Sequence, residues 1–384
     1  MTSPTGTVQL GESDSPRTSV IQVPAALVRG GTSKCWIFRQ SDLPADTADI
    51  ERLLIRTFGS PDLRQIDGVG GASSTTSKAI IVDDLGSADG VVNYRFAQVA
   101  IDKPSVEWDS NCGNCATGLG LYALHARLVP PADGVSRVTI VNTVTGLSLV
   151  CEVPTPGGEV PTYGSRQIPG QYYPGVPVDI IFESSSWTSF ETEMPTGHAV
   201  DEVTVQGRTF HATLIDAGAP AAIFDPRDFG FTGREDADEL EELVALAPEL
   251  RAAAAKVMGI PSHLTSIPKV GIVGPPPAGE TGVSARMISM GALHPAIGLT
   301  SAVAIAAASG RAGSIVANAA VGTAGTSDTA GNAGNTDNDG GDTLAIHLLN
   351  GATRTALDAP VPSKVAFQRS ARVISEGTVL VPGD

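Results

Sequence analysis

The chain has 384 residues, and its hydrophobic content of 42% is enough to bury a substantial core. Its 41 acidic side chains outnumber the 25 basic ones, and the formal net charge of −16 argues against nucleic acid or an anionic membrane as a partner. Four cysteines are too few for a disulfide framework in a chain of this length, so we expect free thiols.

The N-terminus lacks the basic start and hydrophobic core of a signal peptide, and no apolar run approaches the roughly 20 residues that span a bilayer. We therefore expect a cytoplasmic protein. Residues 1–19 are rich in Ser, Thr, Gly and Pro and are expected to form a flexible tail. The remaining length suits two domains better than one.

The first half of the chain predicts a helix and several strands. Apolar residues recur at helical spacing over 46–58 and Gly59 follows them, which predicts a surface helix. A short apolar strand is expected over 79–82. Alternating residues on both sides of Thr145-Gly146 predict a β-hairpin over 138–153, which places Cys151 in the core.

The second half contains two helical segments of different character. Residues 235–258 carry acidic side chains first and basic ones last, the order favoured by the helix dipole, and we expect an interruption at Pro248. Residues 300–309 are almost all small and apolar, so a helix there would be buried on every side and would end at Gly310.

The end of the chain returns to strand patterns after a low-complexity segment. Residues 322–342 are mainly Gly, Ala, Thr, Asn and Asp, and we expect them to form a disordered insertion. Strands are expected over 344–348 and 379–381. The segments 119–128 and 300–309 each follow a glycine-containing polar turn, which favours two similar lobes, each built on a central helix, around one cleft.

A cysteine motif at residues 110–115 precedes the first central helix. The free N–H groups and partial positive charge at a helix start favour thiolate, so we expect Cys112 to ionise near neutral pH and to act as a base or nucleophile. Cys115, one helical turn on, is expected to pack in the core. No second cysteine pair or pair of histidines at ligand spacing accompanies them, which argues against zinc.

Three segments rich in glycine and hydroxyl groups, residues 29–34, 65–71 and 72–78, suit the capture of a carboxylate or a phosphate. The alternative is that they are ordinary turns. Lys78 precedes the strand over 79–82 and is either solvated there or partly desolvated in a cleft. In the second case it can exchange protons near pH 7, and with Cys112 it would form an acid and base pair.

These motifs carry a resemblance to a known family. The segments RGGTSK at 29–34, GSPDLRQIDGVGGASSTTSK at 59–78, FAQV at 96–99 and NCGN at 111–114, with ARMISMGALHPA at 285–296, resemble the 2-methylaconitate isomerase family, which includes aconitate Δ-isomerase. The resemblance implies the diaminopimelate-epimerase-like fold, an α/β (α+β) class with two related lobes, each a curved sheet around a central helix. We divide the chain accordingly into an N-terminal lobe over 20–195 and a C-terminal lobe over 196–384, with the active site between them.

The resemblance also implies that Lys78 and Cys112 transfer protons on a small unsaturated carboxylate, with no cofactor and no metal. One base removes a proton beside the alkene and a carboxylate to form a dienolate, and a proton returns at the same or the far allylic carbon. Which residue is the base stays open, and Arg29 is either a carboxylate clamp or the partner of an internal acid. The residues expected to bind substrate are Arg29, Thr32, Ser33, Gln65, Asp67, Gly70, Gly71, Ser73, Thr75, Ser77, Asn111, Gly113, Asn114, His294, Thr300 and Ser301.

One departure from the family bears on the substrate. Relatives commonly have a His-Pro-Ser-Gly turn near the C-terminus, whereas this chain has His347-Leu348-Leu349-Asn350-Gly351, which favours a larger or less polar substrate. An epimerase or cyclase that uses the same cleft is one alternative, and a noncatalytic carboxylate-binding accessory protein is another. A homodimer is compatible with the sequence.

Overall fold

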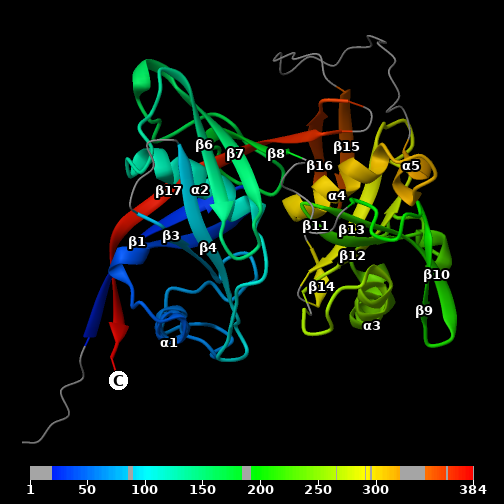
Figure 1. Cartoon of the computed structure of the whole chain (residues 1–384), viewed down its shortest axis with the longest axis horizontal. Helices are drawn as coiled ribbons and strands as arrows, with labels where there is room; N and C mark the ends of the chain where they lie inside the picture. The colour runs from blue at the N-terminus through cyan, green and yellow to red at the C-terminus, as the bar shows by residue number, and fades with distance from the viewer. Residues whose placement is uncertain are drawn as a thin grey trace, which may run out of the picture.

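A computed structural model describes residues 20–84, 90–183, 192–264, 266–289, 291–294, 296–320, 342–359 and 362–383. The expected tail over 1–19 lies outside these residues, as does the expected insertion over 322–342 except for Asp342, which begins a strand. The described chain forms two lobes side by side (Figure 1). No helix in the described ranges is both long enough and apolar enough to cross a membrane.

The N-terminal lobe is a strongly curved sheet wrapped around the helix α2 (Gly113–His125). A second helix, α1 (Thr47–Phe58), packs on the outside of this sheet. The sheet closes through the last strand, β17 (Lys364–Pro382), which pairs with both β8 and β1. The other strands are β1 (Val20–Gly30), β2 (Ser33–Arg39), β3 (Lys78–Val82), β4 (Val91–Val99), β5 (Val106–Glu107), β6 (Gly134–Asn142), β7 (Ser148–Thr155) and β8 (Val176–Glu183).

The C-terminal lobe has the same plan around α4 (Leu299–Ser309), with α3 (Glu241–Met258) on the outside and the short α5 (Ile315–Ala319) beside α4. Its core around α4 is continuous with the core around α2. Its strands are β9 (Asp201–Val205), β10 (Arg208–Ala217), β11 (Ala219–Phe224), β12 (Lys269–Gly274), β13 (Val283–Ser289), β14 (Ala292–Leu293), β15 (Asp342–Leu348) and β16 (Gly351–Leu357).

The two lobes repeat one order of strand pairings. In the N-terminal lobe, β1 pairs antiparallel with β2, β2 parallel with β3, β3 antiparallel with β4, and β4 parallel with β6 across α2. In the C-terminal lobe, β10 to β13 and β15 repeat these four pairings, with α4 in the crossover. The predicted fold, two related lobes each built around a central helix, is therefore confirmed.

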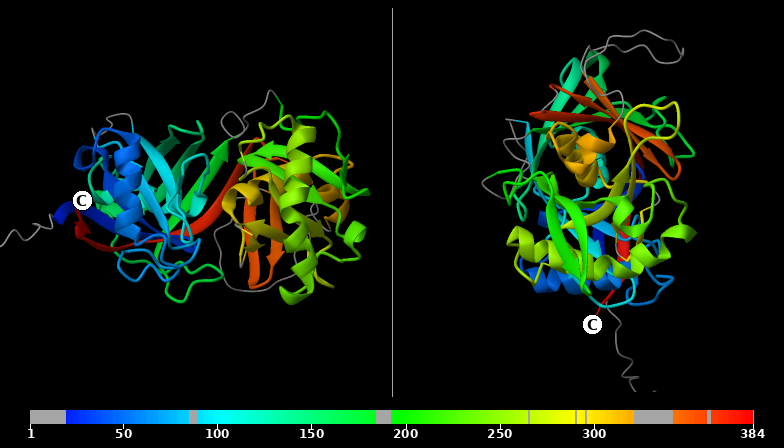
Figure 2. Two further views of the ribbon diagram at one scale, coloured as in Figure 1. Left: turned by 90° about the horizontal axis from the view of Figure 1, so that it is seen from below. Right: turned by 90° about the vertical axis from the view of Figure 1, so that its right-hand side faces the viewer.

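The chain end joins the lobes, because β17 runs from the C-terminal lobe back along the N-terminal one (Figure 2). Its first residues pair with β16 and β8, and residues 371–382 pair with β1. The predicted division near residue 195 remains a prediction. Because residues 371–382 of β17 pair with β1, the last part of the chain packs on the N-terminal lobe.

Several expected elements are confirmed by their local chemistry. The α1 helix begins after Asp46, whose carboxylate accepts the N–H groups of Ala48 and Asp49, and it ends at Gly59 with φ of 78°. The α4 helix is buried from Leu299 to Ala308 and is followed by Gly310. The predicted hairpin over 138–153 is the antiparallel pair β6 and β7.

The expected interruption at Pro248 is wrong, because α3 continues through it from Glu241 to Met258. A proline inside a helix removes one backbone hydrogen bond. Here the apolar face of α3, including Leu243, Leu250 and Ala254, is fully buried against the outer side of the C-terminal sheet. This burial on both sides of the proline offsets the lost bond.

Candidate active site

The first turns of the two central helices meet at the junction of the lobes. Cys112 caps the start of α2 and Gly298 precedes α4. A Cβ atom added to Gly113 would lie 2.7 Å from Cβ of Leu299, so the helix starts are in contact. Their free N–H groups and dipoles make this junction a favourable place for an anion.

A tight turn of each sheet also packs against its central helix. In the N-terminal lobe, a Cβ on Gly30 would collide with the backbone of Asn114, and Gly31 has φ of 51°. The amide of Asn114 donates to the hydroxyl of Thr32 over 3.2 Å. In the C-terminal lobe, Gly218 packs on α4 less tightly, since a Cβ there would lie 3.1 Å from Cβ of Val303 and 3.4 Å from Cα of Thr300. The turn carrying Thr32 and the start of α2 thus form one unit.

The surroundings of Cys112 favour the thiol, in the direction opposite to the effect of the helix dipole. Its sulfur accepts the N–H group of Cys115 at 3.5 Å. The side chain of Cys115 and burial nevertheless raise the pKa of Cys112 well above its usual range, and the positive charge of Lys78 only partly opposes them. Burial raises the pKa of Cys115 as well. The raised pKa favours the protonated thiol of Cys112 at neutral pH.

Lys78 is the first residue of β3 and lies close enough to Cys112 to act on its charge. Its ammonium donates to Oε1 of Gln98 and lies 5.0 Å from the ring centroid of Phe96. Gln98 is held in turn because its Nε2 donates to the carbonyl of Ser77 at 2.8 Å. Sequence reasoning did not single out Gln98, although it lies in the FAQV motif beside Lys78.

His294 approaches the same place from the C-terminal lobe. Burial and the charge of Lys78 lower the pKa of His294 to about 4, so the ring is neutral at physiological pH. Its Nδ1 accepts the N–H group of Ala296 at 3.1 Å, which leaves the ring proton on Nε2. His294 can therefore donate one hydrogen bond to a substrate oxygen without changing charge.

The loop before Lys78 is braced by its own polar side chains. The amide of Gln65 donates to the hydroxyl of Ser77 at 2.8 Å, and that hydroxyl donates to the carbonyl of Val99. Gly70 leaves room for the same amide, since a Cβ there would collide with Gln65. The expected substrate contacts of Gln65 and Ser77 remain predictions, and the structure shows both side chains positioning Lys78.

Hydroxyls of the same loop form a second small network. Ser73 bonds the hydroxyls of Thr75 at 3.1 Å and Thr76 at 2.8 Å. A Cβ on Gly71 would collide with Thr76. Asp67, in contrast, is exposed. The structure thus groups the hydroxyls with the glycines and leaves Asp67 at the surface.

Other expected binding residues divide between the helix starts and internal contacts. Thr300 and Ser301 are buried in the first turn of α4, and Ser33 is buried at the start of β2. Asn111 accepts from the side chains of Asn142 and Thr145, both at 2.8 Å. It therefore ties the turn before α2 to the hairpin of β6 and β7.

Arg29 binds protein groups through Nη1 alone, and its buried Nη2 has no hydrogen-bond partner among the described residues. It donates to the carbonyl of Gly31 and to both the carbonyl and the hydroxyl of Ser370, at 3.1 to 3.2 Å. Burial and the nearby charge of Arg372 lower the pKa of Arg29. These bonds join the turn after β1 to β17. The groups that accept them are neutral, so none of these partners of Arg29 is an acid.

The turn that replaces the family's His-Pro-Ser-Gly lies between β15 and β16. Nε2 of His347 lies 2.9 Å from the carbonyl of Thr281, and a Cβ on Gly351 would lie 3.5 Å from Pro169 of the N-terminal lobe. Near Pro169, Tyr172 and Tyr173 are 85% and 62% exposed, so little of the described chain covers them.

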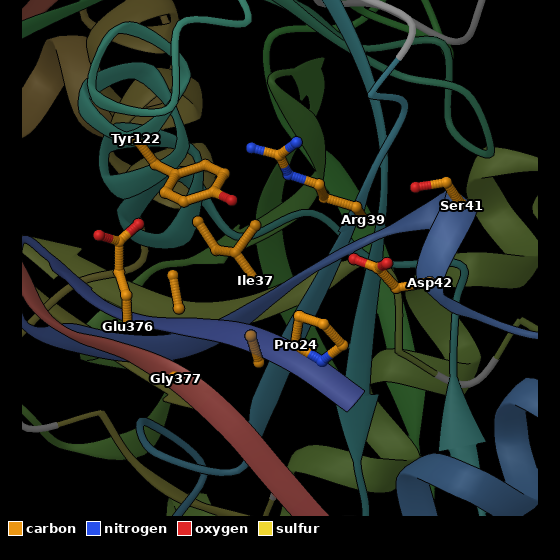
Figure 3. Close-up of a pocket in the computed structure, with 10 residues that line it drawn as sticks. Pro24, Ile37, Arg39, Ser41, Asp42, Tyr122, Glu376 and Gly377 are labelled. Atoms are coloured by element: carbon orange, nitrogen blue, oxygen red, sulfur yellow. The ribbon is translucent and has the colours of Figure 1, made fainter. Parts of the chain in front are cut away.

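A pocket of about 320 Å³ lies elsewhere, at the far end of α2 (Figure 3). Tyr122, Arg39 and Glu376 line it, and Tyr122 hydrogen bonds to Arg39. It contains neither Lys78 nor Cys112, so it is separate from the helix junction. In the described part of the chain, no group of three or more His, Cys, Asp or Glu residues could hold a metal ion.

Comparison with known proteins agrees with this geometry. The chain is 35% identical to a 2-methyl-aconitate isomerase of Shewanella oneidensis, over 94% of this chain and 97% of that protein. It is 37% identical to a (4E)-oxalomesaconate Delta-isomerase of Novosphingobium sp. (strain KA1), over 78% and 83% respectively. The crystal structure of a methylitaconate-delta-isomerase superposes with a TM-score of 0.73 at 28% identity, covering 94% of this chain and 96% of that one. The model of the PrpF protein family matches residues 20–382, and the chain belongs to this family.

Proposed function

We propose that the protein is an isomerase that moves a proton on an unsaturated carboxylic acid, so that a double bond shifts or changes geometry, and that it needs no cofactor. The observation that carries this proposal is the meeting of the α2 and α4 starts, with the thiol of Cys112 on one of them and Lys78 beside it. The relatives named above are isomerases of such acids.

The raised pKa of Cys112 favours the thiol as the acid and Lys78 as the base. Lys78 first gives up one ammonium proton to water and then takes a proton from the carbon beside the alkene and a carboxylate, and the electron pair left on that carbon spreads into a dienolate. The Cys112 thiol, whose pKa is raised, delivers its proton to the far allylic carbon. The ammonium is then back in its starting form, and the thiolate regains a proton from water, so the cycle is balanced.

The helix starts supply the donors for the substrate. The N–H groups of Gly113 and Asn114 point out of the first turn of α2, and those of Thr300 and Ser301 out of the first turn of α4. Such fixed donors bind a carboxylate and stabilise the negative charge that develops on it in the dienolate. The neutral ring of His294 adds one more donor.

Proton NMR in deuterated water tests this proposal. Protein dialysed against EDTA is mixed with 2-methylaconitate, trans-aconitate, 3-methylitaconate and 4-oxalomesaconate in turn. We expect deuterium to enter at least one acid at the allylic position and a new isomer to form at the same time, with the chelator having no effect. Binding without exchange would instead identify a noncatalytic carboxylate-binding protein, and activity lost with EDTA would contradict the cofactor-free mechanism.

The same spectra test the expectation of a larger or less polar substrate. That expectation rests on the leucines that replace the family's Pro-Ser between His347 and Gly351. It predicts slow turnover of the small acids. Rates in the ordinary enzyme range of about 1 to 1,000 per second on trans-aconitate or 2-methylaconitate would contradict it.

A further inference from the structure

The internal duplication places a second lysine, Lys269, at the position that corresponds to Lys78. Lys78 begins β3, the strand that pairs parallel with β2, and Lys269 begins β12, the strand that pairs parallel with β11. In each lobe the outer helix, α1 or α3, precedes this strand, and an apolar run follows the lysine. The two lysines are therefore presented by equivalent strand starts of the two lobes.

Lys269 also lies near the reacting pair. The charge of Lys78 acts on its ammonium, although Lys78 belongs to the other lobe. Glu107, at the end of β5 in the N-terminal lobe, acts on it as well. Lys269 is thus a C-terminal-lobe lysine close enough to Lys78 to be affected by its charge.

Within the described ranges, the ammonium of Lys269 has no anionic group at hydrogen-bonding or ion-pair distance. Its only hydrogen bond among the described residues is donated to the carbonyl of Ser266 at 3.0 Å, and no ion pair within 4 Å involves it there. Burial, with the like charges of Arg251 and Lys78, lowers the pKa of Lys269 to about 8. The side chain is still mostly charged at pH 7, and a bound carboxylate would supply the partner that the protein does not.

We propose that Lys269 binds a second carboxylate of the substrate, the one that is not held by the N–H groups at the start of α2. This inference rests on the proposed function and makes the site selective for polycarboxylates over monocarboxylates. The substrate then spans the junction, with the reacting carbons near Lys78 and Cys112 and the second carboxylate on the C-terminal lobe. Lys269 positions the substrate and takes no part in the proton transfer.

Calorimetric binding of two probes to the full chain tests the proposal. The probes are trans-aconitate, with three carboxylates, and crotonate, with one. We expect Lys269→Met to weaken trans-aconitate binding about 10- to 100-fold, the usual value of a hydrogen bond to a charged group, and crotonate binding less than about twofold. Lys269→Arg should restore part of the loss. The matched control is Lys256→Met, which removes an exposed lysine of α3 and should leave both affinities unchanged.

Thermal unfolding of the same variants separates binding from a structural role. Removal of a partly buried ammonium that lacks an ion pair should leave the Tm of Lys269→Met equal to or above that of the wild type. The proposal is overturned if the wild type does not bind trans-aconitate or if Lys269→Met binds it as tightly as the wild type. It is also overturned if Lys269→Met loses affinity for both probes equally, or if the Met and Arg variants do not differ. Because these are binding measurements, a protein that shows the expected losses but no deuterium exchange would contradict only the proposed function.

Discussion

At the scale of single residues, the two thiols at the start of α2 show that neighbouring groups can outweigh the effect of a helix dipole on the pKa of a thiol. A helix dipole stabilises a charge at its end by about 0.3 to 1 kcal/mol at the surface. Cys112 is partly buried and has the thiol of Cys115 beside it, and these two effects outweigh the dipole and Lys78. The sequence predicts the position of Cys112 correctly, but its protonation depends on contacts that only the fold defines.

Alkylation of Cys112 should therefore begin only at high pH. We expect its rate with iodoacetamide, followed by peptide mass spectrometry, to rise with an apparent pKa well above the usual value of about 8.5. Because the folded pKa is raised, the thiol form persists through neutral pH and is lost only above that range. Cys115→Ala removes the largest cause of the shift and should move the rise to lower pH.

Cys151 supplies the control, since it is fully buried, packs against Gly120 of α2 and is not among the groups that raise the pKa of Cys112. Its substitution by Ala should leave the alkylation profile of Cys112 unchanged. A wild-type apparent pKa at or below about 8.5, or a profile that does not respond to Cys115→Ala, would contradict the proton-donor role of Cys112.

At the scale of elements, the predictions succeed where the signal is local. The α1 helix has its apolar spacing, its Asp46 cap and its Gly59 end within one segment, and the β6 and β7 hairpin has its alternation and its turn. Pro248 misleads because the packing that keeps α3 continuous comes from distant strands. Local patterns thus predict that an element exists, and tertiary contacts decide where it stops.

The contact between α2 and α4 yields a prediction at the same scale. Gly113→Ala would place a methyl group 2.7 Å from Cβ and 2.9 Å from Cδ1 of Leu299. Because both atoms belong to a buried helix start, the helices must move apart. We expect a loss of about 1 to 3 kcal/mol in the free energy of unfolding, measured by urea denaturation, and a lower kcat.

Gly377→Ala is the matched control, because nothing lies within 4 Å of a Cβ at Gly377. Its free energy of unfolding should stay within about 0.5 kcal/mol of the wild type. Equal effects of the two substitutions would mean that the contact between the helix starts does not constrain the site.

At the scale of the whole molecule, the duplication explains what the sequence reveals about the site and what it misses. The motifs that contain Lys78 and Cys112 predict the N-terminal half of the site, but the sequence motifs do not predict Lys269. A signal for it exists, since SIPK precedes the apolar run of β12 as STTSK precedes that of β3. The pairing of β17 with β1 joins residues more than 340 positions apart, and no local pattern encodes such a register.

The most direct test of the account is the kcat for deuterium incorporation into the acid that turns over best. We expect Lys78→Met and Cys112→Ala to lower it by about a hundredfold to ten-thousandfold, the usual contribution of a general acid or base. Lys256→Met and Cys151→Ala, which remove an exposed lysine and a buried cysteine outside the proposed proton-transfer pair, should stay within about threefold. If Lys78→Met or Cys112→Ala kept kcat within threefold of the wild type, these two residues would not be the proton-transfer pair.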